Sequence, residues 1–77
     1  MSKLLIVDYK TMHRFLSSQG FGIARQKGSH VFYRNPDGRT TTVPNHGGRD
    51  LSRPLIREIL REIDVTSEAF NRILNEL

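Results

Sequence analysis

Two short turns divide the middle of the chain into three runs of β-forming residues, and they constrain the fold more than any other feature. Lys27-Gly28-Ser29 separates a run that ends at Gln26 from His30–Asn35, and Pro36-Asp37-Gly38 separates that run from Arg39–Val43. Turns this short join antiparallel neighbours, because a parallel connection needs a crossover of about a dozen or more residues. The sequence therefore predicts an antiparallel meander of three strands, which ends at Pro44 and the glycines that follow it.

Helical patterns flank this meander. Apolar residues recur at helical spacing in three segments, and each segment follows a residue whose side chain can cap a helix: Asp8, Ser52 and Thr66. Gly20 is the stop signal of the first helix, and Pro54 is tolerated in the first turn of the second. The apolar positions are Tyr9, Met12, Phe15 and Leu16, then Leu55, Ile56, Ile59, Leu60 and Ile63, and finally Ala69, Phe70, Ile73, Leu74 and Leu77.

The predicted fold class is α+β, in the order α-β-β-β-α with a short additional C-terminal helix, as one domain over residues 1–77. The two main helices should cover one face of the sheet and leave the other open, an arrangement that resembles the double-stranded-RNA-binding domain. Strand parity puts His30, Phe32 and Arg34 on one face, and Val31 and Tyr33 on the other. The sequence does not decide which of these faces the helices cover.

Charge is distributed unevenly along the chain. There are 12 Lys and Arg residues against 8 Asp and Glu residues, which gives a net charge of +4. A basic middle is typical of proteins that bind a phosphate backbone, although a merely basic, solvated surface would have the same composition. The segment from residue 57 onward is acidic on balance, whereas the basic residues gather upstream: Lys3, Lys10, Arg14, Arg25, Lys27, Arg34, Arg39, Arg49 and Arg53.

Several classes of protein and site are disfavoured. The chain has no cysteine, so it has neither disulfides nor thiolate metal sites. The longest apolar run, Leu4–Val7, is too short for a membrane span or a secretory signal, so we expect a cytoplasmic protein with no membrane contact. The histidines His13, His30 and His46 lack the spacing of a zinc site, and no metal or other cofactor is expected.

Three motifs carry a resemblance to a known family. Arg25–His30 reads Arg-Gln-Lys-Gly-Ser-His, Tyr33–Arg39 reads Tyr-Arg-Asn-Pro-Asp-Gly-Arg, and Thr42–Gly48 reads Thr-Val-Pro-Asn-His-Gly-Gly. With this spacing, the chain resembles the HicA family of mRNA interferase toxins over essentially its whole length; Met12-His13 and Arg49-Asp50 depart from the pattern. The resemblance implies a dsRBD-like fold and the toxin role in a type II toxin–antitoxin system. It also implies metal-independent endoribonuclease activity, a HicB-type antitoxin as partner, and His30 as the catalytic residue.

The residues around His30 support this role independently of the resemblance. RNA cleavage can use the neighbouring 2′-hydroxyl as nucleophile, so the protein need only move protons and stabilise charge on the phosphate. Histidine suits the proton step, because its ordinary pKa of about 6.5 leaves both the protonated and the neutral form populated at cellular pH. Gly28 and Ser29 place His30 at a strand entrance, where the backbone can approach a phosphate closely. The alternative is a surface histidine, or one whose polar atoms are satisfied within the protein.

The other candidate residues are assigned to binding or packing. His46 lies in a glycine-rich loop whose amides can cup an anion, and we expect it to position substrate or brace the loop rather than do chemistry. His13 is expected to be half-buried packing, and Phe21, Ile23 and Phe32 to be core residues rather than a stacking platform for RNA. The predicted RNA-binding set is Arg25, Lys27, Gly28, Ser29, Arg34, Arg39 and His46.

Two other classes of function remain open beside an RNA-cleaving toxin. The basic middle and the fold would equally suit a non-catalytic RNA-binding module, and a domain that only binds an acidic protein is the third possibility. If a HicB-type antitoxin is the partner, direct occlusion is the simplest inhibition, with contacts at the Gly28–His30 turn and the Asn45–Gly48 loop. A grip on the C-terminal helix around Phe70 is the alternative.

Overall fold

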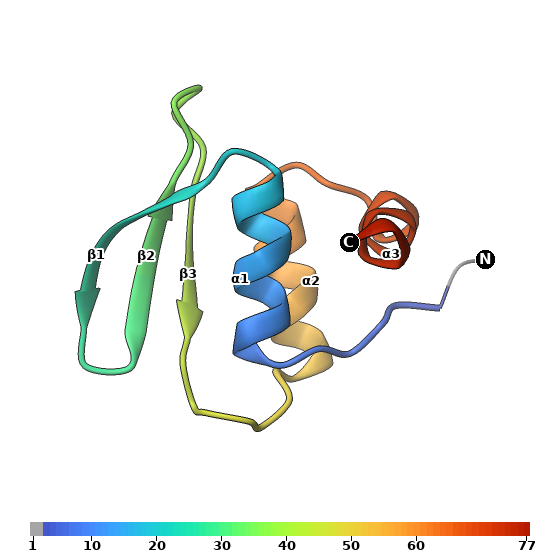
Figure 1. The fold of residues 1–77 in the computed structure, drawn as a ribbon, viewed down its shortest axis with the longest axis horizontal. Helices are drawn as coiled ribbons and strands as arrows, with labels where there is room; N and C mark the ends of the chain where they lie inside the picture. Colours follow the sequence, from blue (N-terminus) through green and yellow to red (C-terminus); the bar gives the residue numbers. More distant parts are fainter. Residues whose placement is uncertain (1–2) are drawn as a thin grey trace.

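The computed structural model describes residues 3–77 and contains three helices and three strands (Figure 1). The predicted α+β class and element order are confirmed, with a third helix that is as long as the other two. The elements are α1 (Tyr9–Ser18), β1 (Gly22–Lys27), β2 (His30–Arg34), β3 (Thr40–Pro44), α2 (Arg53–Glu62) and α3 (Ser67–Glu76).

Each helix begins at the capping residue that the sequence predicts. The carboxylate of Asp8 accepts a hydrogen bond from the amide of Thr11 at 2.9 Å, and Ser52 and Thr66 cap α2 and α3 in the same way. These bonds satisfy amides that have no partner inside the helix. At the other end of α1, Gly20 takes a left-handed conformation with φ +89°, which residues other than glycine rarely adopt.

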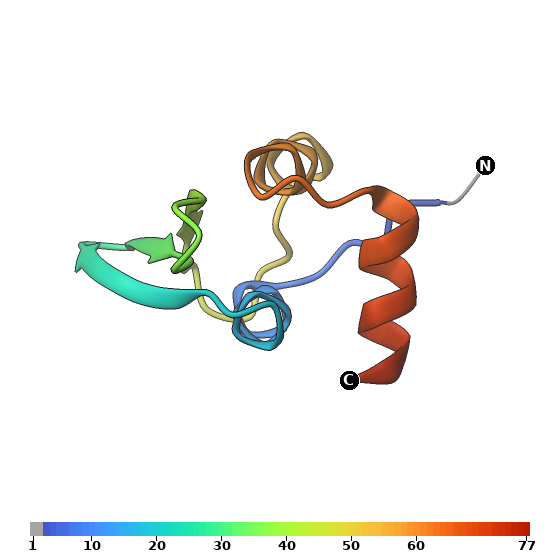
Figure 2. The same cartoon turned by 90° about the horizontal axis from the view of Figure 1, so that it is seen from above.

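The three strands form one antiparallel sheet in the order β1-β2-β3, as the two short turns predict. Val31, Tyr33, Thr41 and Val43 are buried, and α1 and α2 lie together on that side of the sheet (Figure 2). The Thr41 hydroxyl donates to a carboxylate oxygen of Glu62 on α2 at 2.8 Å. The helices therefore cover the face of Val31 and Tyr33, and the face of His30 and Phe32 is open.

The first strand extends beyond the helices. All six residues of β1 are exposed, and Ile23 keeps 51% of its surface accessible to solvent. The expectation that Ile23 and Phe32 belong to the core is wrong, because β1 lies outside the area that the helices cover and Phe32 is half-buried on the open face. Phe21, which precedes β1, is buried as expected.

The third helix packs on the side of α1 and α2 away from the sheet, so the molecule has three layers (Figures 1 and 2). The Phe70 ring on α3 is fully buried and meets Phe15 of α1 edge-to-face, with ring centroids 4.8 Å apart. The segment before α1 lies against α3, because the Asn71 side chain accepts from the Leu5 amide at 3.1 Å and donates to the Lys3 carbonyl at 2.5 Å. Among residues 3–77, no helix is long and apolar enough to cross a membrane.

Candidate functional site

The register of the sheet brings the predicted site residues into rows on the open face. His30 pairs with Lys27 on β1 and with Pro44 on β3, and the next row on this face joins Arg25, Phe32 and Thr42. Directly paired residues of an antiparallel sheet place their side chains on the same face. The strands themselves contain no acidic residue, so this face combines one histidine with several cations and no carboxylate from the sheet.

A β-bulge places Ile23 and Arg25 on opposite faces of the sheet, while the register set by the Gly28 turn keeps Arg25 and Lys27 on the face of His30. Without it, Ile23, Arg25 and Lys27 would share one face, because alternate residues of a regular strand point the same way. The register shifts between Ile23 and Arg25, so Ile23 pairs with Tyr33 on the helix-covered face while Arg25 pairs with Phe32 on the open one. Bulges of this kind re-aim side chains near functional sites.

His30 is exposed at the first position of β2, directly after the turn. Gly28 in this turn has φ +58°, a conformation for which glycine is favoured. The Ser29 carbonyl accepts a hydrogen bond of 2.6 Å from the amide of Asn45, which ties the turn to the loop after β3. The turn of Gly28, Ser29 and His30 therefore lies next to the Asn45–Gly48 loop.

A cation–aromatic contact on this face joins Arg25 to Phe32. The guanidinium carbon of Arg25 lies 4.5 Å from the centre of the Phe32 ring, within the range of a cation–π interaction. Arg25 stays exposed to solvent in this contact. Arg34 lies in the third row, opposite Gly22, at the end of β2 away from His30.

His46 is exposed in the loop after β3, one residue beyond Asn45. It lines a shallow pocket on the side of the loop that faces the start of α2, together with Arg49, Asp50 and Leu55. His46 therefore lies one residue beyond the contact of Asn45 with Ser29, beside the start of α2 and outside the row of Lys27 and His30.

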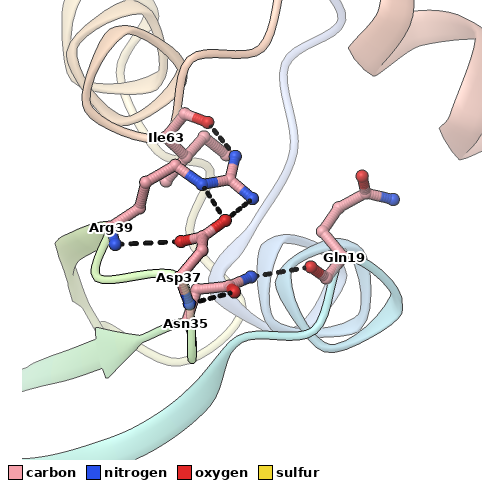
Figure 3. Close-up of polar contacts among 5 residues, drawn as sticks. All are labelled: Gln19, Asn35, Asp37, Arg39 and Ile63. Carbon is pink, nitrogen blue, oxygen red and sulfur yellow. Dashed lines mark hydrogen bonds and ion pairs between the residues drawn. The ribbon is translucent and has the colours of Figure 1, made fainter.

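Arg39 lies at the opposite end of the sheet, in the turn between β2 and β3, and its guanidinium has partners within the protein (Figure 3). Its Nε donates to the Asp37 carboxylate at 2.9 Å, and Nη1 donates to the Ile63 carbonyl at the end of α2. The Arg39 guanidinium holds the pKa of Asp37 below its usual range, and the Asp37 carboxylate raises the pKa of Arg39. The structure thus separates Arg39 from Arg25, Lys27 and His30, which lie toward the other end of the sheet.

Asn35 connects this turn to α1. Its side-chain amide donates to the Gln19 carbonyl at 2.9 Å, and its side-chain oxygen accepts from the Asp37 amide at 3.1 Å (Figure 3). Asn35 is only 7% exposed, and both of its polar side-chain atoms are satisfied. Asn35 and Arg39 therefore connect the β2–β3 turn to the C-terminal ends of α1 and α2. At this end of the molecule these polar side chains stabilise the fold.

A hydrogen-bonded cluster on the helix-covered side of the sheet was not predicted from the sequence. The Tyr33 hydroxyl, on a side chain that is 1% exposed, lies 2.7 Å from the Tyr9 hydroxyl and 2.8 Å from Nδ1 of His13. Burial raises the pKa of Tyr33, so its hydroxyl keeps its proton. His13 is half-buried, as predicted, but it also makes this polar contact. The signal in the sequence is the spacing of Tyr9 and His13, one helical turn apart.

Within residues 3–77, no group of three or more His, Asp or Glu side chains is arranged to hold a metal ion. The groups on the open face that can act chemically are the His30 imidazole, which can transfer a proton, and the cations of β1 and β2, which can bind phosphates. This combination suits a nucleic-acid backbone better than a small apolar ligand.

The sequence matches the family described as HicA toxin of bacterial toxin-antitoxin over residues 9–65. The matched segment runs from the first residue of α1 to just beyond the end of α2, so it contains the whole sheet, the His30 turn and the Asn45–Gly48 loop. No curated protein matches the chain. The chain therefore belongs to the HicA toxin family and carries the toxin domain of a bacterial toxin–antitoxin system, whose partner is an antitoxin.

Proposed function

We propose that this toxin is an endoribonuclease that binds RNA across the open face of its sheet and cleaves it with His30 as the catalytic residue. The observation that carries the proposal is the row formed by His30 and Lys27, with Arg25 in the next row, on a face whose strands carry no acid. An exposed imidazole beside cations is suited to a substrate that brings its own nucleophile and a negative charge.

The proposed reaction needs only proton transfer and charge stabilisation. The ribose 2′-oxygen attacks the adjacent phosphorus, the bond from phosphorus to the 5′-oxygen breaks, and the products are a 2′,3′-cyclic phosphate and a 5′-hydroxyl. His30 takes the proton from the 2′-hydroxyl or gives one to the departing 5′-oxygen, and water exchanges the other proton. Lys27 and Arg25 stabilise the charge that develops on the phosphate oxygens.

A non-catalytic RNA-binding module is the second candidate, and three cations on the open face favour it. Arg25, Lys27 and Arg34 would hold phosphates whether or not the chain cleaves them. In that case His30 would be one more contact to RNA.

The proposed antitoxin is a HicB-type protein that covers the His30 turn. The hydrogen bond from Asn45 to Ser29 makes the turn and the Asn45–Gly48 loop one continuous surface, so a single partner segment could bury both. An acidic partner would be attracted to the basic face and would exclude RNA from it.

Cleavage of a long RNA by the purified protein and by its His30→Ala variant tests the proposal. We expect wild type to cleave and the variant to lose cleavage by about 10²–10⁴-fold while keeping its RNA affinity, because a proton-transfer group contributes that much. His30 is exposed, so the variant should fold, which circular dichroism checks. Cleavage by the variant at the wild-type rate would remove His30 from the mechanism. Salt-sensitive binding without cleavage by wild type would favour the RNA-binding module.

A further inference from the structure

A second pocket, of about 340 Å³, lies between the start of α1 and the loop after β3. Asp8, Tyr9, Lys10 and His13 line it from α1, and Asn45, Gly47 and Gly48 line it from the loop. Nothing in the proposed cleavage step uses these α1 residues. The β1–β2 turn, the loop after β3 and the first turn of α1 all lie at the same end of the molecule (Figure 1).

The floor of this pocket is aromatic and rigid. The Tyr9 and His13 rings are stacked, with centroids 6.0 Å apart and planes 25° from parallel. Both side chains are bonded to the buried Tyr33 hydroxyl, so their orientation is fixed before any ligand binds. The hydrogen bond to Tyr33 uses Nδ1 of His13, and Nε2 has no hydrogen-bond partner among residues 3–77. A flat, unsaturated ligand with polar edges fits such a floor.

The charges around the pocket favour a neutral group inside it and a phosphate at its rim. The Thr11 amide lowers the pKa of Asp8, so a carboxylate stays ionised at the wall and repels a phosphate from the interior. The same carboxylate accepts hydrogen bonds from amino groups such as those on adenine, guanine and cytosine. Lys10 is exposed at the rim, where it can bind a phosphate outside the pocket.

The pocket also lies close to His30. Asn45, which forms part of its wall, donates its amide to the carbonyl of Ser29, the residue before His30. A strand of RNA with a phosphate at His30 would therefore bring a nearby nucleotide to the pocket. Unpaired bases that are splayed out of a single strand and stacked on aromatic side chains are the common mode of RNA recognition by proteins.

We propose that this pocket holds an unpaired nucleobase of the RNA, close in the strand to the phosphate at His30, and so selects where the toxin acts. This inference rests on the proposed function, because it takes RNA as the ligand of the open face. The base stacks on the accessible side of the Tyr9 and His13 pair, and its edge meets Asp8.

The test uses a variant that fills the pocket without disturbing its floor. Gly48 lines the pocket and has no left-handed φ, and a Cβ added there meets nothing within 4 Å, so we expect Gly48→Leu to fold and to place its side chain at the pocket. Gly22 has the same properties on the open face beside Arg34, at the end away from the pocket, so Gly22→Leu controls for a bulky side chain on the RNA-binding face that leaves the pocket empty. The probe is a single-stranded oligoribonucleotide with 2′-O-methyl riboses, which cannot be cleaved, and a series of the same strand with one abasic site at each position.

One abasic position should weaken binding to wild type and to Gly22→Leu by about 5- to 150-fold, the range expected from stacking of a single base. Gly48→Leu should bind the intact strand as weakly as wild type binds the abasic strand. Its affinity should not fall further when that base is removed. In NMR spectra of wild type, the amides of Lys10, His13 and Gly48 should shift with the intact strand and not with the abasic one.

Three outcomes separate this inference from the proposed cleavage. If the loss of affinity caused by an abasic site is unchanged in Gly48→Leu, or occurs at no position, the pocket does not bind a base, even if wild type cleaves RNA. If this loss of affinity disappears only in Gly48→Leu, the pocket binds a base, even if wild type cleaves no unmodified RNA. Wild type that binds none of these strands would overturn both.

Discussion

The four arginine and lysine residues predicted to bind phosphates differ in what surrounds them. Arg25 and Lys27 are exposed, Lys27 in the row of His30 and Arg25 in the next row, and Arg34 lies further along the same face. The Arg39 guanidinium instead bonds to Asp37 and Ile63 at the far end of the sheet. Similar residues in the sequence therefore have different environments, and we expect only the first three to displace counterions from RNA.

Salt dependence of RNA binding should report this difference. Changing Arg25, Lys27 or Arg34 to Ala should weaken binding and reduce the slope of log K against log salt by about 0.7–1 for each phosphate that is no longer neutralised. Arg39→Ala should leave the slope at its wild-type value, because its charge is already paired. Binding titrations at several salt concentrations give the slopes, and equal slopes for all four variants would contradict the assignment.

The chemistry assigned to His30 predicts the response to chelators and the ends of the products. Attack by the 2′-hydroxyl leaves a cyclic phosphate or 3′-phosphate, whereas attack by a metal-activated water commonly leaves a 3′-hydroxyl. Cleavage should persist in excess EDTA, and mass spectrometry of the fragments should find phosphate at the 3′ end. Complete inhibition by EDTA, reversed by adding a divalent metal, would contradict this mechanism.

At the scale of elements, the sheet is joined to the helices mainly through β2 and β3. The β2–β3 turn is fastened to the ends of α1 and α2 through Asn35 and Arg39, whereas β1 is bonded only to β2 and is exposed along its whole length. The strand that carries Arg25 and Lys27 is therefore accessible, and the fastened turn at the other end keeps the sheet in place.

Asn35 provides a test of that fastening. Asn35→Ala leaves the Gln19 carbonyl and the Asp37 amide without their partners, and an unsatisfied buried polar group costs about 1–3 kcal/mol. The free energy of unfolding, measured with denaturant, should fall by that amount. Asn75→Ala on the exposed surface of α3 is the control and should change it by no more than about 0.5 kcal/mol. An equal, small change in both variants would show that the turn is not fastened through Asn35.

Considered as a whole, the molecule has two ends with different roles. The end with the β2–β3 turn contains the Asn35 and Arg39 contacts (Figure 3), and the other end contains the His30 turn, the Asn45–Gly48 loop and the first turn of α1 (Figure 1). An inhibitor that covers the second end would block both His30 and the base pocket. α3 lies on the far side of α1 and α2 from the sheet, and it is beyond the matched family segment.

Hydrogen exchange on the complex with the antitoxin distinguishes two ways of inhibiting the toxin. Direct occlusion predicts strong protection at residues 28–34 and 45–48, because the bond from Asn45 to Ser29 makes these segments adjacent. RNA that is bound beforehand should slow formation of the complex. Protection confined to residues 66–77 would contradict occlusion and would mean that the antitoxin acts through α3.

The sequence by itself determined the elements of this protein and the place of His30 among them. The caps at Asp8, Ser52 and Thr66, the two turns and the meander depend on residues close together in the chain, so local side-chain chemistry is enough to predict them. The motif around Gly28 likewise placed His30 at a strand entrance beside Lys27, because both flank the same turn.

Only the tertiary structure decided which face of the sheet is open and what lies on it. Either parity of β2 was compatible with the sequence until α1 and α2 covered Val31 and Tyr33. The bulge between Ile23 and Arg25 put Ile23 on the face opposite to Arg25, and the Ile63 carbonyl engaged Arg39 from a distant part of the chain. The pocket between α1 and the loop after β3 likewise joins segments that no local pattern connects. Such features depend on contacts between residues far apart in sequence, and periodicity and turn chemistry report only on neighbours.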